Sequence, residues 1–68
     1  MNIKVGEKYQ ILSGPEKTPQ EVMHIRAIVD RNYVVYRIWS KRKQMWRYSV
    51  ESKYYLELLE KDERLIKK

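Results

Sequence analysis

Two strand-forming runs separated by a short basic break constrain the fold of this chain more than any other feature. Residues 32–39 are almost all β-branched or aromatic, and residues 44–50 carry Trp46, Tyr48 and Val50 at alternate positions. Residues 41–43, which read Lys-Arg-Lys, lie between them. Two such runs joined by so short a connection predict an antiparallel hairpin.

The register of this hairpin decides which side chains face the core, because a slip of one residue moves every side chain to the opposite face. Pairing Ser40 with Gln44 would place on one apolar face Val34, Tyr36, Ile38, Trp46, Tyr48 and Val50. The other face would then carry Tyr33, Val35, Arg37, Trp39, Met45, Arg47 and Ser49. We favour this register, since the alternative with Trp39 opposite Gln44 would mix Arg37 with both tryptophans and leave neither face fully apolar.

Two further strands are expected before the hairpin. Residues 7–12 alternate loosely after a turn at Gly6, and residues 13–20 hold both prolines and the second glycine, which predicts a loop. In residues 21–30 apolar residues stand at both odd and even positions, a pattern that also fits a helix. Their β-branched pairs favour a strand. A tight turn at residues 30–32, with Asn32 at a positive φ, should lead into the next strand.

The last third of the chain predicts a helix, because Leu, Glu and Lys replace the β-branched residues. Ser49 is the expected N-cap, and Glu51 in the first turn suits the helix dipole. The face that anchors the helix is expected to hold Tyr55, Leu58 and Leu59. Asp62 would interrupt this apolar stripe, so we expect a break at residues 61–62, after which Leu65 and Ile66 either tuck back or pair as a last short strand.

The size of the chain limits what it can build. Its 68 residues make a single domain, and a domain of that size buries only about 60% of the surface that its unfolded chain exposes. With no cysteine, packing alone must stabilise it. The expected fold is therefore α+β, a small, strongly curved antiparallel sheet or barrel of four or five strands with a C-terminal helix closing one end.

The composition favours a cytoplasmic protein with no membrane association. No apolar run approaches the length of a membrane span, and the N-terminal residues lack the apolar segment of a secretory signal. The absence of cysteine fits a reducing compartment.

Three segments carry a resemblance to a known class of proteins: VGEKY at residues 5–9, YVVYR at 33–37 together with Trp46 and Arg47, and residues 49–59. In these the chain resembles the small SH3-like barrel proteins found among bacterial and phage accessory genes. The resemblance implies an SH3-like barrel that binds nucleic acid or a partner protein, and several phage-encoded inhibitors of host defence are similar in size. It implies no catalytic or ligand-binding residue.

Little in the sequence predicts an enzyme. His24 is the only histidine and there is no cysteine, so neither a Cys-His pair nor a multi-histidine metal site is available within one chain. We interpret His24 as a strand residue on a partly exposed face. No Gly-rich phosphate loop is present. We therefore expect no catalytic activity, no cofactor and no metal.

Binding is the better prediction, because the net charge of +6 is concentrated in residues 37–48, which also hold both tryptophans and no acidic residue. Lys and Arg attract nucleic-acid phosphates, and an exposed aromatic ring can stack on unpaired bases. The predicted binding residues are Arg37, Trp39, Lys41, Arg42, Lys43 and Arg47, with Trp46, Tyr36 and Tyr48 assigned to the core. The same residue types also suit an inhibitor or adaptor that docks on an acidic protein surface, and a homodimer formed through a strand edge or the helix is a third alternative.

Overall fold

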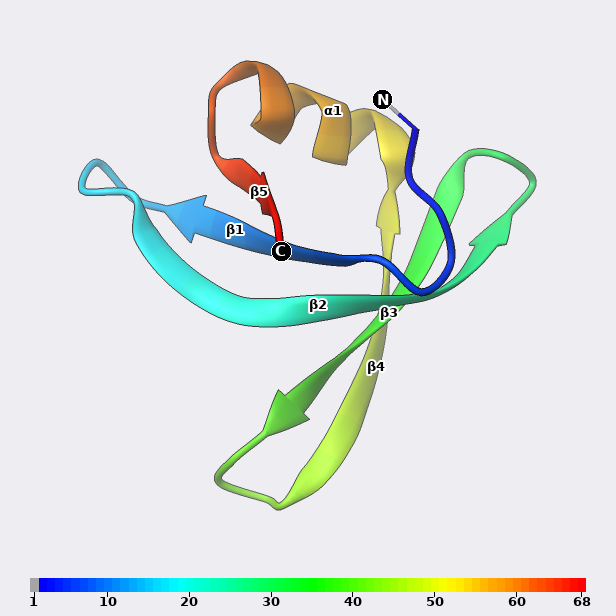
Figure 1. Ribbon diagram of the computed structural model, residues 1–68, viewed down its shortest axis with the longest axis vertical. Coiled ribbons are helices and arrows are strands. Elements are labelled where there is room, and N and C mark those ends of the chain that lie inside the picture. The colour runs from blue at the N-terminus through cyan, green and yellow to red at the C-terminus, as the bar shows by residue number, and fades with distance from the viewer. Residues whose placement is uncertain (1) are drawn as a thin grey trace.

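Five antiparallel strands and one helix make up the fold. The computed structural model describes residues 2–68, with β1 (Lys8–Ser13), β2 (Thr18–Val29), β3 (Tyr33–Ser40), β4 (Met45–Ser52), α1 (Lys53–Lys61) and β5 (Leu65–Lys67) along the chain. The order in the sheet is β4-β3-β2-β1-β5, so the last strand returns beside the first. The predicted α+β fold with a curved antiparallel sheet is confirmed, but β4 and β5 do not pair and the sheet stays open (Figure 1).

Bulges bend β2, the longest strand, and explain its ambiguous sequence. The pairing of β2 with β3 shifts between Ile25 and Ala27, so Arg26 is the extra residue of a β-bulge. A bulge changes the face on which the following side chains lie. For this reason Ile25 and Ile28 both pack in the core, although their positions differ in parity.

The core lies between the sheet and α1. It consists of Ile3, Tyr9, Met23, Ile25, Val34 and Leu56, all of which are buried. Partly buried residues extend it: Ile11, Ile28, Tyr36, Ile38, Leu59 and Leu65. We call the side of β2, β3 and β4 that packs on this core the covered face, and the opposite side the open face.

The predicted register of the β3–β4 hairpin is wrong by one residue. Ser40 pairs with Met45, not with Gln44, and the turn comprises residues 41–44. Gln44 adopts a left-handed φ of 54°, and the Ser40 hydroxyl accepts a hydrogen bond from the Lys43 amide at 3.2 Å, which fixes the longer turn. Trp46, Tyr48 and Val50 consequently lie on the open face, not in the core.

The other turns also differ in detail from expectation. The loop after β1 is shorter than predicted, because β2 already begins at Thr18 and Pro19 pairs opposite Leu12 beside a bulge. In the tight turn between β2 and β3 the positive φ values belong to Asp30 and Arg31, not to Asn32. The Asn32 carbonyl instead accepts a hydrogen bond from the Lys53 amide at 2.8 Å, which fixes the start of α1.

The helix starts later than predicted. β4 continues through Ser52, whose side chain caps α1 by accepting from the Tyr55 amide, so Ser49 and Glu51 belong to the strand. Leu56 is the buried anchor with Leu59 beside it, whereas Tyr55 and Leu58 are exposed. The break at residues 61–62 and the short last strand are confirmed. No helix within residues 2–68 has the length and apolar character needed to cross a membrane.

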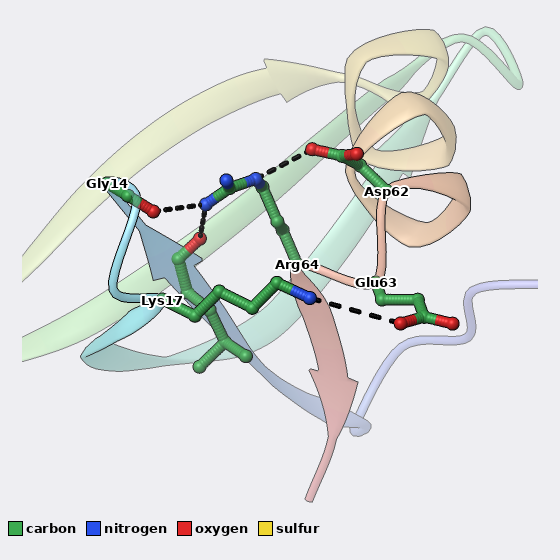
Figure 2. Close-up of polar contacts among 6 residues, drawn as sticks. Gly14, Lys17, Asp62, Glu63 and Arg64 are labelled. Carbon is green, nitrogen blue, oxygen red and sulfur yellow. Dashed lines mark hydrogen bonds and ion pairs between the residues drawn. The ribbon is translucent and has the colours of Figure 1, made fainter.

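Arg64 connects the turn after α1 to the end of β1 and the loop that follows it (Figure 2). Its Nη1 donates to the carbonyls of Gly14 at 2.7 Å and Leu12 at 3.3 Å, and its Nε donates to Asp62 at 2.6 Å. These contacts hold the turn after α1 against the loop between β1 and β2.

Candidate nucleic-acid interface

Pairing across the strands gathers five large side chains on the open face. Trp39 lies opposite Trp46, Arg37 opposite Tyr48, and His24 opposite Arg37. Directly opposed residues share a face of the sheet, so these five form one contiguous surface. We call His24, Arg37, Trp39, Trp46 and Tyr48 the Trp46 cluster.

Trp46 lies at the centre of this cluster. The guanidinium carbon of Arg37 lies 3.9 Å from the centre of its ring, a cation–π contact. The rings of His24 and Trp39 meet Trp46 edge-on, at centroid distances of 5.0 and 5.2 Å. Arg37 also donates from Nη1 to the Tyr48 hydroxyl at 3.2 Å, so its charge is held in a fixed position.

The cluster is cationic, although one carboxylate residue, Glu21, lines the groove that His24 and Trp39 border. No Asp or Glu occupies a paired open-face position of β2, β3 or β4 in the described part of the chain. Burial, followed by the positive charges of Lys8, Arg37 and Arg26, lowers the pKa of His24 below its usual 6.5. His24 is therefore neutral at pH 7, and Arg37 supplies the charge of the cluster.

The basic turn, Lys41, Arg42 and Lys43, extends from the end of this surface. All three residues are exposed. The turn is stabilised by its own residues, because the Gln44 side chain donates to the Lys41 carbonyl at 2.7 Å and Ser40 at its start is buried. The three exposed cations thus belong to an ordered turn. Figure 1 shows the tip of the β3–β4 hairpin at the opposite end of the molecule from α1.

Arg47 is separated from the other predicted binding residues. It pairs opposite Ile38, so the slipped register places it on the other side of β4 from Trp39. There it lines a hollow of about 280 Å³ that Tyr36 and Ile38 also border. The prediction that Arg37, Trp39 and Arg47 share a face is wrong for Arg47.

A groove adjoins the cluster between the β1–β2 hairpin and the start of the basic turn. Its volume is about 540 Å³, and its lining includes Trp39, His24 and Lys41 together with the carboxylate residue Glu21. Gln10 and Gln20 line it as well, and both donate their amide nitrogens to backbone carbonyls, of Gln20 and Thr18 respectively. Their amide oxygens are the atoms left to accept hydrogen bonds from a ligand.

Trp46, Tyr48 and His24 are the site residues that sequence reasoning missed. The first two were assigned to the core on the wrong register, and His24 was interpreted alone. The alternative register, with Trp39 opposite Gln44, would have indicated Trp46 and Tyr48, because it places Arg37 on one side of the hairpin with both tryptophans. Searches against models of protein families, curated proteins and solved structures find no significant match, so the functional argument rests on the residues themselves.

Proposed function

We propose that this protein is a non-catalytic module that binds nucleic acid through the Trp46 cluster and the basic turn, with little dependence on base sequence. The observation that carries the proposal is the cation on the open face: Arg37 is fixed over Trp46, beside exposed rings, and within residues 2–68 no Asp or Glu occupies a paired position on that face of β2, β3 or β4. Nucleic acids are the polyanions that such a surface attracts most generally, because each nucleotide adds a charged phosphate.

Unpaired bases fit this surface better than a closed duplex. Trp39 and Tyr48 are 38% and 61% exposed, so each offers a ring to a base. Stacking on such rings contributes about 1–3 kcal/mol per base and tolerates any base, since each has an aromatic face. The basic turn would follow the phosphates of the same strand.

The groove beside Trp39 supports the same proposal. It borders Lys41 as well as the ring, so a base inserted there would have a cation beside its phosphate. The amide oxygens of Gln10 and Gln20 would accept hydrogen bonds from the exocyclic amino group of a base.

We also propose that the fold is an SH3-like barrel. An SH3-like barrel of the type found among bacterial and phage accessory proteins would place its last strand beside its first, and the observed sheet order is compatible with that. A cytoplasmic location would give such a module access to nucleic acid.

A salt titration tests the function. Fluorescence anisotropy with labelled single- and double-stranded oligonucleotides should show binding at low salt, tighter for the single strand, and weakening as salt rises. Changing Lys41, Arg42 and Lys43 together to Ala should reduce the slope of log K against log salt by about 0.7 for each phosphate that the variant no longer neutralises.

The matched control removes three charges elsewhere, with Lys4, Lys61 and Lys68 changed to Ala. This variant should keep the wild-type slope and most of the affinity. Undetectable binding at low salt, or an equal loss in both triple variants, would reject the proposal.

An inhibitor or adaptor, of the type phages encode, that binds a host protein is the second candidate. One observation favours it: the open face continues past the cluster into an apolar region that includes exposed Tyr33 and Val50. Capture of a partner from nuclease-treated host lysate, abolished by changing Tyr33 and Val50 to Ser, would support this candidate. Loss of every captured protein on nuclease treatment would reject it.

A further inference from the structure

Strand β4 is a long strand with one free edge. Its eight residues pair with β3 on one side, and within residues 2–68 no strand pairs with the other side. The opposite outer strand, β5, has only three residues. An edge of that length presents a row of unpaired amide and carbonyl groups, which is a template for another strand.

Geometry restricts how β4 can pair with a second copy of itself. Along an antiparallel strand, only every second residue turns its peptide groups toward a given neighbour. Two residues that pair across a twofold axis must therefore both have odd numbers or both have even numbers. It follows that one residue lies at the axis and pairs with the same residue of the second copy. The central candidates are Arg47, Tyr48, Ser49 and Val50.

Charge distinguishes these four registers. An axis at Arg47 places two Arg47 side chains together, and an axis at Val50 places Arg47 opposite Lys53 of the second copy. An axis at Tyr48 leaves Arg47 opposite a serine. Only an axis at Ser49 places Arg47 opposite Glu51, and the symmetry forms this pair twice.

The same register matches the other exposed side chains of the strand. Tyr48, which is 61% exposed, comes to lie opposite Val50 of the second copy, which is 57% exposed. The last pair is Trp46 with Ser52, and α1 begins at the next residue. The paired segment therefore ends where the strand ends.

We propose that the chain forms a twofold-symmetric dimer in which β4 pairs antiparallel with β4 of a second copy, with Ser49 on the axis. The pairing joins the two five-stranded sheets into one. Because the axis is perpendicular to the sheet, both open faces lie on the same side. The dimer does not depend on nucleic-acid binding, but it would place two Trp46 clusters side by side.

Cysteine substitution tests the register directly, since the chain has no cysteine of its own. In Ser49→Cys the two Cα atoms lie about 4.5–5.5 Å apart in this dimer, within the range that a disulfide spans. In the controls Val50→Cys and Tyr48→Cys, the two cysteines are offset by about 7 Å along the strand, which is too far to bridge. Under mild oxidation we expect a cross-linked dimer from Ser49→Cys alone, and preferential linking of either control would overturn the proposal.

Charge reversal tests the pair that selects the register. Sedimentation velocity should give the wild-type protein twice the 8.4 kDa mass of one chain. Arg47→Glu, an exposed position, should give the monomer mass, and the double variant Arg47→Glu/Glu51→Arg should restore the dimer. Circular dichroism checks that each variant is folded. A folded double variant that remains monomeric, or a wild type that is monomeric at all concentrations, would overturn the proposal.

Discussion

The same strands carry two faces with opposite roles. On β3, Val34, Tyr36 and Ile38 pack against the core, and Val34 is 0% exposed. The alternate residues Arg37 and Trp39 lie on the open face with Trp46 and Tyr48. Both faces are rich in large side chains, but only one packs on the buried core, to which the helix contributes Leu56.

This difference separates stability from binding within one small sheet. Burial of apolar area stabilises a fold by about 25 cal/mol per Å², so the covered face must carry most of the folding free energy. The open face retains exposed aromatic area that contributes little to folding. Substitutions on the two faces should therefore affect different measurements.

The largest effect is expected for Leu56→Ala, which empties the helix side of the core. Leu56 is 1% exposed, and truncation of such a leucine lowers the free energy of unfolding by about 2–5 kcal/mol. Urea denaturation followed by circular dichroism measures the loss. The matched control is Val29→Ala, a 44% exposed position on the open face and outside β4, for which we expect a change within about 0.5 kcal/mol. Similar losses for both variants would mean that the open face is also covered.

The next largest effect is expected for Trp39→Ala, and it should appear in binding. Loss of its ring should weaken single-stranded oligonucleotide binding by about 1–3 kcal/mol, because a stacking surface is removed. Its effect on unfolding should be smaller than that of Leu56→Ala, since Trp39 is 38% exposed. Trp39→Phe, which keeps an aromatic face, should retain most of the affinity. Wild-type affinity in Trp39→Ala would remove this ring from the proposed interface.

The sequence predicted the elements of the sheet better than its register. β3 was found because almost every residue in it is β-branched or aromatic, and the break after Lys61 because Asp62 interrupts the apolar stripe. The position of β4 depends on the Ser40 hydroxyl and on the left-handed φ of Gln44, local contacts that composition does not reveal. Any of several turns would have satisfied the apolar pattern.

The error of one residue in the register of β4 also affects the predicted binding residues. Arg37 and Trp39 lie where the sequence placed them relative to each other, and the basic turn is exposed as expected. Arg47 was assigned to the same face, and Trp46 to the core, because each follows the register of β4. The Trp46 cluster exists only because the slip moved an apparent core tryptophan beneath Arg37.

The residue before β1, Glu7, is a carboxylate that should make stability depend on pH. Glu7 accepts hydrogen bonds from Lys67 Nζ at 2.5 Å, from the Lys4 amide at 2.8 Å and from the Tyr9 hydroxyl at 2.9 Å. The Lys67 contact is the main reason that the pKa of Glu7 falls from 4.5 to about 2. Its stabilisation is therefore complete above pH 4.5 and is lost as the pH falls toward 2.

Thermal unfolding across this window measures the contribution of Glu7. The melting temperature of the wild type should fall steeply between pH 4.5 and 2, and Glu7→Gln should melt lower at pH 5 but with a flatter acid profile. Glu16→Gln, a change in the exposed loop after β1, is the control and should keep the wild-type profile. Equal slopes for Glu7→Gln and the wild type would assign the acid transition to other groups.

The smallest effect is expected for His24, the titratable group of the open face. Burial and the charges of Lys8, Arg37 and Arg26 lower its pKa, so the folded protein favours the neutral ring. Its contribution to stability is then complete above pH 6.5 and declines as the pH falls through the folded pKa, so this decline begins at a higher pH than that of Glu7. His24→Phe keeps a ring against Trp46 and should abolish this decline in pH-dependent melting. Because neutral His24 adds no charge to the cluster, oligonucleotide affinity should stay constant from pH 7 to pH 8. If affinity instead falls over that interval, and if His24→Phe removes the fall, a charged His24 takes part in binding.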